Sequence, residues 1–286
     1  MDILFTIIAI LALILLWIII YDSNRFIVVS HHIEDRRIKK SSRAVVIADL
    51  HNKSYGNNNE ALLQAIREQK PDYVFIAGDV ATAKKGKTNK NAIAFLDKLV
   101  KEYPIYYGNG NHEQRMKLYP KTYGDMGVQY EKTIREMGIH LLVNENVVLK
   151  ESGICIFGSE IGHGYYRKYK SNTIGEEYLK EILGVPKEDC YNILLAHNPE
   201  FFLDYTKWGA DLVLSGHVHG GIARVPFWGR GVLSPKLKLF PKYDGGLFNQ
   251  ENTTMIISRG LGVHTIPVRV FNPGELIVID FSPARE

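Results

Sequence analysis

The chain opens with one long apolar segment and continues as short apolar runs separated by polar ones. Residues Ile3 to Tyr21 contain no charged side chain and are nearly all Ile, Leu, Ala or Phe. A helix of this length measures about 30 Å, which matches the hydrocarbon core of a bilayer. We therefore predict one N-terminal transmembrane helix over residues 1–21.

A cleavable signal peptide and a buried core helix are the alternatives for this segment. The signal peptide fits less well, because Asp2 stands where Lys or Arg is usual and no small-residue cleavage site follows. Lys and Arg residues flank the segment only on its C-terminal side, from Arg25 to Lys40. The positive-inside rule then favours a cytoplasmic location for the rest of the chain, and we expect the lipid bilayer as a partner.

Beyond the apolar segment, residues 22–42 form a polar connector of mixed charge, in which Phe26 to Val29 has the pattern of an edge strand. Apolar runs and amphipathic stretches then alternate. We predict strands at 44–48, 73–77 and 105–107, and helices at 60–70, 92–101 and 123–137. Closely spaced strands follow at 141–143, 147–149, 154–157, 193–196, 212–214, 254–257 and 276–279.

This order of elements predicts an α/β domain over residues 43–286, built from two packed mixed sheets with helices on their outer faces. Its length suits one large domain with a buried core. The net charge of +4 is too weak to indicate a nucleic-acid partner, so none is expected. Cys155 and Cys190 are far apart and belong to no Cys-x-x-Cys pair, which argues against a disulfide framework or a zinc ribbon.

Five short motifs rich in metal-ligand residues each follow one of the predicted strands. They are Asp49-Leu50-His51, Gly78-Asp79, Gly110-Asn111-His112-Glu113, Ala196-His197 and Gly216-His217-Val218-His219. Ligands in open α/β sheets lie beyond the carboxyl ends of strands, so these motifs are expected to converge. If the backbone stays extended, alternation would place Asp49 and His51 on one side, and His217 and His219 likewise.

Each motif alone has an ordinary structural explanation. Asp-x-His and Gly-Asp are common in turns and helix caps, and a lone histidine can be a satisfied core residue. The paired imidazoles of Gly-His-x-His are the most specific of the five. Together they predict a metal site with seven candidate ligands, namely Asp49, His51, Asp79, Asn111, His197, His217 and His219.

The motif set D-x-H, G-D, G-N-H-E, a lone His and G-H-x-H-G-G resembles the calcineurin-like metallophosphoesterases over about residues 43–280. The resemblance implies a four-layer α/β/β/α sandwich with a two-metal centre. By the same resemblance, Asp49, His51 and His219 would hold the first metal and Asp79 would bridge. The second metal would be completed by Asn111, His197 and His217, and His112 would be a non-ligand catalytic histidine near the leaving group.

One position departs from the family pattern, because Gly78-Asp79-Val80-Ala81-Thr82 lacks the second Asp of the longer G-D-x-x-D form. That residue is not a metal ligand in the family. The resemblance further implies two divalent cations and a phosphoester hydrolase that uses a metal-bridging hydroxide. Histidine ligands disfavour Mg²⁺ and Ca²⁺, so Mn, Fe or Zn is expected.

The segment from Arg224 to Lys242 is basic and rich in aromatic residues, and it contains no acidic residue. It is either a solvated loop or an amphipathic rim that meets phospholipid headgroups. Arg224 and Arg230 are tentative substrate contacts within it. Arg259 is a further candidate phosphate contact, with a surface ion pair as the alternative.

The apolar segment together with G-H-x-H-G-G is similar to a membrane-associated branch of the family. That branch includes cell-envelope phosphodiesterases and UDP-diacylglucosamine pyrophosphohydrolase-like enzymes. We therefore expect hydrolysis of a phosphodiester or pyrophosphate bond in a phosphorylated lipid or envelope precursor. A protein or nucleotide phosphatase is the enzymatic alternative, and a non-catalytic membrane-tethered scaffold is the other one. The sequence gives no indication of the oligomeric state.

Overall fold

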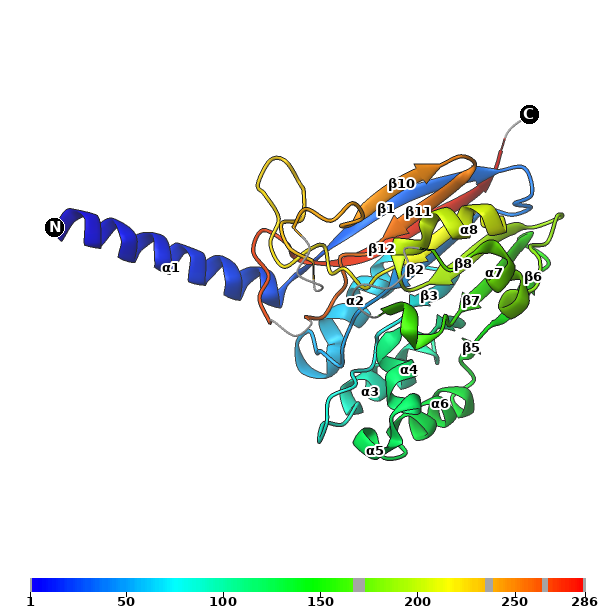
Figure 1. The fold of residues 1–286 in the computed structure, drawn as a ribbon, viewed down its shortest axis with the longest axis horizontal. Helices are drawn as coiled ribbons and strands as arrows, with labels where there is room; N and C mark the ends of the chain where they lie inside the picture. Colours follow the sequence, from blue (N-terminus) through cyan, green and yellow to red (C-terminus); the bar gives the residue numbers. More distant parts are fainter. Residues whose placement is uncertain (1, 167–172, 235–238, 264–266, 285–286) are drawn as a thin grey trace.

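The computed structural model describes residues 2–166, 173–234, 239–263 and 267–284. The predicted apolar helix is present as α1 (Asp2–Asn24), and it projects from an α/β domain (Figure 1). Within the described residues, one helix is long and apolar enough to cross a membrane, over Ile3–Asn24. The rest of the chain folds into two six-stranded sheets with helices on their outer faces.

The first sheet has the strand order β1-β12-β2-β3-β4-β5. Its strands are β1 (Phe26–Asp35), β2 (Ser42–Ile47), β3 (Tyr73–Ala77), β4 (Ile105–Gly108), β5 (His140–Leu142) and β12 (Gly274–Pro283). Strand β12 is parallel to β1 and antiparallel to β2, while β2 to β5 are parallel to one another. The sheet is therefore mixed, as expected.

The second sheet has the order β10-β11-β9-β8-β7-β6. Its strands are β6 (Glu145–Leu149), β7 (Ile154–Ser159), β8 (Tyr191–Ala196), β9 (Leu212–Ser215), β10 (Gly246–Gln250) and β11 (Thr253–Ile257). The four central strands are parallel, and antiparallel strands form both edges.

Helices cover the outer face of each sheet. They are α2 (Glu60–Gln69), α3 (Lys90–Leu99), α4 (Asn111–Leu118), α5 (Pro120–Tyr123), α6 (Met126–Glu136), α7 (Glu176–Leu183) and α8 (Phe202–Trp208). Short 3-10 turns occur at η1 (Asn57–Asn59), η2 (His163–Tyr166) and η3 (Pro199–Phe201). One apolar core lies between the sheets, and two more lie between each sheet and its helices. The predicted four-layer sandwich is confirmed.

Strand β3 illustrates why the sheets are buried on both faces. All five of its residues are buried, and successive side chains enter different cores. Val74 and Ile76 pack under the helices, whereas Tyr73 and Phe75 pack against the second sheet. Period-two alternation combined with burial on both sides produces this continuous apolar run.

The structure adds elements that the apolar pattern did not reveal. Helices α4, α7 and α8 and strand β10 were not predicted, and Asn111 opens α4. Residues 111–118 carry few apolar side chains, so the helical period is weak there. The edge strand expected at 26–29 extends to Asp35, so most of the predicted connector is incorporated into the first sheet.

Strand directions bring the carboxyl ends of three strands of the first sheet towards α1. Strand β1 begins directly after α1 and runs away from it, and β12 runs the same way. Because β2 is antiparallel to β12, the carboxyl ends of β2, β3 and β4 return towards α1.

Candidate metal centre

All five motifs lie at carboxyl ends of strands, as the sequence predicts. Asp49 and His51 follow β2, Asp79 follows β3, and Asn111 and His112 open α4 after β4. The second sheet contributes the three remaining histidines, with His197 after β8 and His217 and His219 after β9. The structure brings together residues that lie far apart in the sequence, such as Asp49 and His219.

The first group of ligand atoms belongs to Asp49, His51 and His219. The Nε2 atoms of His51 and His219 are 3.1 Å apart. The Oδ1 atom of Asp49 lies 3.3 Å from His219 Nε2 and 3.6 Å from His51 Nε2. Three donors therefore face a common point.

The second group consists of Asp79, His197 and His217, whose ligand atoms all lie within 4.8 Å of one another. His197 Nε2 is 3.0 Å from Asp79 Oδ2. The same Asp79 oxygen is 3.9 Å from His51 Nε2, so this carboxylate stands between the two groups. That position suits the bridging role which the resemblance implies.

The donor atoms fit a pair of divalent cations. Metal bonds of about 2.0–2.2 Å set neighbouring ligands about 3.0–3.5 Å apart, close to most separations within the two groups. Within the part of the chain that the structure describes, Asp49 Oδ1 and the side-chain oxygen of Asn111 are buried without a hydrogen-bond donor. Orphaned buried oxygens are costly unless a cation compensates them.

The ligand pairs converge by a different backbone route from the extended one expected. Positive φ angles occur at Asp49 (51°), His51 (49°), Asp79 (56°), His217 (71°) and His219 (53°). Left-handed conformations of non-glycine residues cost on the order of 1–3 kcal/mol each and cluster at functional sites. The extended backbone that would place His217 and His219 on one side by alternation is therefore not present. The two histidines belong to different ligand groups, as the resemblance implies.

Backbone amides orient the two carboxylates. The amide of His217 donates to Asp49 Oδ2 at 2.8 Å, and that of His112 donates to Asp79 Oδ1 at 2.7 Å. The other oxygen of each carboxylate is thereby directed towards the histidines. Gly110 permits this approach, because a Cβ atom there would lie 2.2 Å from Asp79 Oδ1.

Glu113 holds the loops that carry the ligands together. This role was not assigned from the sequence, although the residue is part of the G-N-H-E motif. Its buried carboxylate accepts hydrogen bonds from the amides of Asp79, Ala81 and Gly110 at 2.9–3.0 Å. The hydroxyl of Tyr107 donates to it as well, at 2.8 Å. Burial, reinforced by the charge of Asp79, raises the pKa of Glu113 to about 7.

The electrostatics of the site favour cations. Burial alone would raise the pKa of Asp49, but the imidazoles of His219 and His197 outweigh burial and hold it well below the ordinary value. Asp79 is shifted in the same direction, by His197 and His112 against burial. For His197, the two carboxylates overcome burial and raise the pKa to about 10. The buried carboxylates thus create a strong negative field.

His112 has a defined tautomer. Its Nδ1 atom accepts a hydrogen bond from the amide of Ala83 at 2.9 Å. The neutral ring therefore carries its proton on Nε2. Its ring centroid is 4.6 Å from that of His51, and one of its ring nitrogens lies within 4.8 Å of ligand atoms of His51 and Asp79, so His112 borders both ligand groups.

The three predicted arginine contacts lie outside both ligand groups and are held by the surrounding chain. Arg224 is buried and donates to the carbonyls of Gly220, Gly229 and Asp244. These bonds make Arg224 a structural clamp rather than a substrate contact.

Arg230 contacts the Asp244 carboxylate at 3.2 Å and donates to the carbonyl of Pro241. Arg259 has its Nε atom 3.5 Å from Glu275 Oε1, so the alternative of an ion pair is present.

Comparison with known proteins agrees with this geometry. A model of the calcineurin-like phosphoesterase family matches residues 42–221. An uncharacterized metallophosphoesterase of Campylobacter jejuni is 29% identical over 87% of this chain, which spans 62% of that relative's length. The metallophosphoesterase YkuE of Bacillus subtilis is 25% identical over 82% of this chain and 77% of its own.

Among solved structures, the NAD nucleotidase of Haemophilus influenzae matches 77% of this chain and 45% of its own. The TM-score is 0.42 and the identity 16%, too low for a functional comparison. The family model, by contrast, covers more than half of the sequence and includes all seven candidate ligands. The chain belongs to the calcineurin-like phosphoesterase family.

Proposed function

We propose that this chain is a two-metal hydrolase of phosphodiester or pyrophosphate bonds. The observation that carries the proposal is the pair of ligand groups, with Asp79 standing between them. Bound divalent cations would lower the pKa of a water molecule and offset the charge of the phosphoryl group. Mn, Fe or Zn suits the mixed nitrogen and oxygen donors best.

The chain's own residues supply orientation and a proton. Water adds its oxygen to phosphorus, the P–O bond to the leaving group breaks, and one water molecule is consumed. His112 Nε2, which bears the proton when Nδ1 accepts from Ala83, donates to the departing oxygen. Glu113 keeps the turns after β3 and β4 together, so that Asp79 and Asn111 stay aligned.

The substrate class follows from the surroundings of the site. The apolar α1 and the basic, aromatic segment Arg224 to Lys242 favour a phosphorylated lipid or envelope precursor over a soluble nucleotide or phosphoprotein. Retention of α1 as an anchor is supported by its contacts with the domain. Asp22 and Ser23, at its C-terminal end, accept hydrogen bonds from Asn272 and Lys53.

Metal-dependent turnover of bis-p-nitrophenyl phosphate by the full chain in detergent tests the reaction. We expect activity with Mn²⁺, Fe²⁺ or Zn²⁺, loss of activity with chelator, and loss in His217→Ala. His140→Ala is the matched control, because His140 is exposed at the start of β5 and stacks on Tyr106. The absence of turnover with each of these metals would favour a scaffold instead.

A further inference from the structure

We propose that the edge of the domain carrying the metal centre docks on the bilayer surface beside α1. On this assignment the substrate is an amphiphile whose phosphate lies at headgroup level. The choice of substrate rests on the proposed function, whereas the docking surface does not. The partner is a lipid surface, recognised through exposed aromatic side chains and positive charge.

The register of β12 gives the distance between α1 and the metal centre. Phe26, two residues after α1, pairs with Gly274, and Val46 pairs with Ile277. The three residues of β12 from Gly274 to Ile277 span about 10 Å along the strand. Asp49 lies three residues beyond Val46 in the direction of α1. Asp49 is therefore at about the same height along the sheet as Phe26. Two strand spacings add about 10 Å sideways. The metal centre is therefore within reach of the interface at which α1 ends.

Hydrogen bonds join α1 to the metal-centre loops. The Asp22 carboxylate accepts from the amide of Asn272 at 3.2 Å. The side chain of Asn272 donates in turn to the carbonyls of His219, at 2.8 Å, and Gly221. Lys53, two residues after His51, donates to the carbonyl of Ser23. These contacts fix the height of the metal centre relative to the span.

Aromatic residues in α1 mark the level of the interface. Trp17 and Tyr21 stack with their ring centroids 5.1 Å apart, and the guanidinium of Arg25 lies 4.6 Å from the ring of Tyr21. Trp and Tyr are enriched at headgroup level, and Arg extends into the water beyond it. Tyr21 and Arg25 therefore place the C-terminal end of α1 at the headgroup region, beside the start of β1.

A second set of exposed apolar side chains lies at the same end of the molecule. We call Phe227, Trp228, Leu239 and Phe240 the aromatic rim. Phe227 is fully exposed, and Trp228, Leu239 and Phe240 are 64%, 69% and 47% exposed. The connection between β9 and β10, which carries the rim, projects on the side from which α1 leaves (Figure 1).

Backbone contacts link the base of that connection to α1. Ala223 bridges to Val270, and the amide of Arg224 donates to the carbonyl of Val270 at 3.0 Å. Asn272, two residues later, is the residue that donates to Asp22. Between them, Phe271 is 46% exposed with a φ of 51°. The rim and the end of α1 are thus supported by one short segment.

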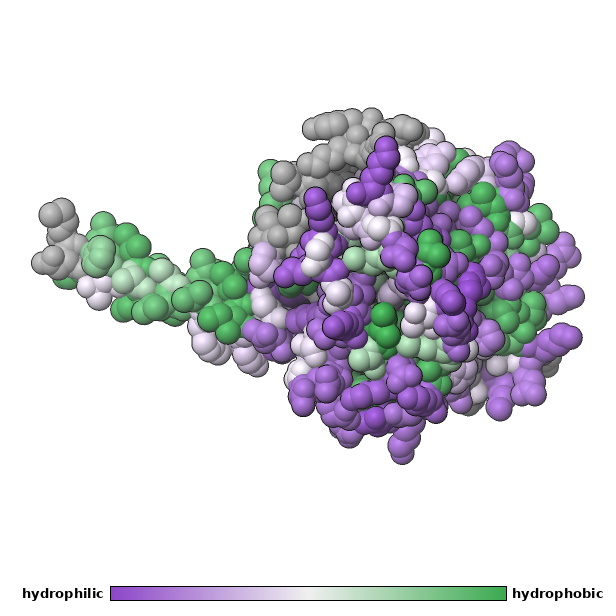
Figure 2. Space-filling view, turned by 90° about the horizontal axis from the view of Figure 1, so that it is seen from below, coloured by the Kyte–Doolittle hydropathy of each residue, from purple (hydrophilic) through white to green (hydrophobic). Residues whose placement is uncertain are grey.

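Charge and hydropathy suit a lipid surface. α1 is apolar along its length, whereas the face of the domain seen from below is largely hydrophilic (Figure 2). Against that background, clustered exposed aromatic residues mark an interaction site. Arg224 and Arg230 lie beside Asp244, so among the described basic residues of this segment the exposed Lys242 would attract anionic headgroups, at about 1 kcal/mol near the surface.

The three tryptophans of the chain allow a direct test. The full chain is labelled with 5-fluorotryptophan and reconstituted in nanodiscs containing phosphatidylglycerol and a nitroxide-headgroup lipid. Trp17 in α1 reports the membrane, and Trp208, buried in α8, reports the distant part of the domain. Trp228→Phe and Trp17→Phe assign the fluorine resonances.

We expect the nitroxide to broaden Trp17 and Trp228 but to leave Trp208 sharp. A Trp228 resonance as sharp as that of Trp208 would overturn the docking surface. The readout needs no turnover, so its failure is distinct from failure of the proposed reaction.

The substrate part is tested with two esters that share a leaving group. One is a long-chain amphiphile carrying a p-nitrophenyl phosphodiester in vesicles, and the other is soluble bis-p-nitrophenyl phosphate. Exchanging Phe227 and Trp228 for serine should lower turnover in vesicles about tenfold, with a smaller change on the soluble ester. Leu203→Ser, an exposed position in α8, is the control. Equal losses on both esters would overturn the amphiphile assignment.

Discussion

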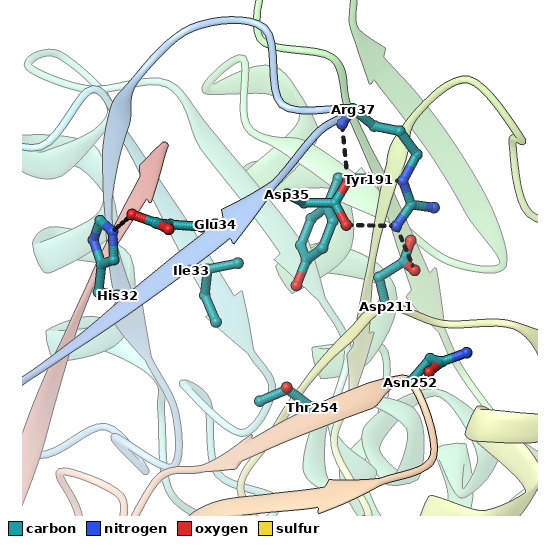
Figure 3. A pocket seen from close by; sticks show the side chains of 9 residues that line it. All are labelled: His32, Ile33, Glu34, Asp35, Arg37, Tyr191, Asp211, Asn252 and Thr254. Atoms are coloured by element: carbon teal, nitrogen blue, oxygen red, sulfur yellow. Dashed lines mark hydrogen bonds and ion pairs between the residues drawn. The ribbon is translucent and has the colours of Figure 1, made fainter. Parts of the chain in front are cut away.

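Charged side chains are paired differently at the two ends of the sandwich. At the end near α1, Asp49, Asp79 and four ligand histidines point their donor atoms at one another across a shared space. At the other end, Arg37 is gripped by Asp35 and Asp211 at 2.8–2.9 Å and lies over the ring of Tyr191 (Figure 3). That far end borders an open pocket of about 650 Å³.

The difference separates binding chemistry from structural chemistry. In the far pocket, the carboxylates of Asp35 and Asp211 accept hydrogen bonds from the Arg37 guanidinium, so these acceptors are satisfied within the protein. Near α1, Asp49 Oδ1 is buried with no hydrogen-bond donor among the described residues, and several residues adopt left-handed backbone conformations. The unsatisfied acceptors near α1, and not the open pocket at the far end, therefore indicate a cation site.

The largest effect is expected from removing the carboxylate of Asp79, which lies between the two ligand groups. Asp79→Asn keeps the size but loses the charge that faces both groups. We expect turnover of bis-p-nitrophenyl phosphate to fall to the level measured with chelator. The bound metal, measured by elemental analysis, should fall below two equivalents per chain. Wild-type metal content and turnover in this variant would refute the assignment.

His112→Ala should give the next largest effect, because on the proposed function it removes a proton donor and leaves the seven candidate ligands in place. General acid catalysis contributes about 10²–10⁴-fold, so we expect a loss in that range with poor alkoxide leaving groups. The loss should shrink with p-nitrophenolate, which departs without a proton. A loss that is the same for both leaving groups would assign His112 to the metal or the phosphate instead.

Asn272→Ala tests whether support from behind the site matters. Its side chain holds the carbonyls of His219 and Gly221, and removing such supporting contacts costs about 10–100-fold in metal affinity. Asn192→Ala is matched to it, since Asn192 is equally buried and bonds to Lys187 and Cys190 near the far end. Titration with Zn²⁺ should separate the two variants. Equal Zn²⁺ affinities of the two variants would show that Asn272 does not support the metal centre.

The smallest effect is expected at the far end. Arg37→Gln should lower the free energy of unfolding by roughly 0.2–1 kcal/mol, as for partly exposed ion pairs, and leave turnover unchanged. The Arg37 hydrogen bond is the main cause that holds the pKa of Asp35 below its ordinary value.

A lowered folded-state pKa adds stability above the unfolded pKa near 4, and this stability disappears as pH falls through the folded pKa. Urea unfolding at pH 7 and pH 3 should therefore show the variants converging at acid pH. A gap that persists or widens at pH 3 would contradict this account.

Residue patterns were most informative where one period dominates. The strand at 73–77 has the bounds predicted from its apolar run, and every ligand motif lies after a strand as expected. Convergence of the ligands follows from parallel strands ending at one edge. Helix α4 was not predicted, because Asn111, His112 and Glu113 are polar although they are buried. The segment therefore lacks the apolar periodicity that indicates a helix.

Other features depend on contacts between distant segments and could not be read locally. The tautomer of His112 is set by the amide of Ala83, twenty-nine residues away. Arg224 was a reasonable candidate for a substrate contact until the structure placed it among backbone carbonyls. The left-handed backbone at Asp49 and His51 is likewise accompanied by distant contacts, because their amides donate to the carbonyls of Gly78 and Asp79.

The position of β12 has a consequence for biosynthesis. This strand, the last in the described chain, lies between β1 and β2 and is the direct partner of both. Until it emerges from the ribosome, β1 has no neighbour in the sheet and the segment behind α1 remains unpaired. An anchor in α1 would enter the bilayer long before that moment. The catalytic domain would then complete its folding only after tethering, on the membrane where it is proposed to work.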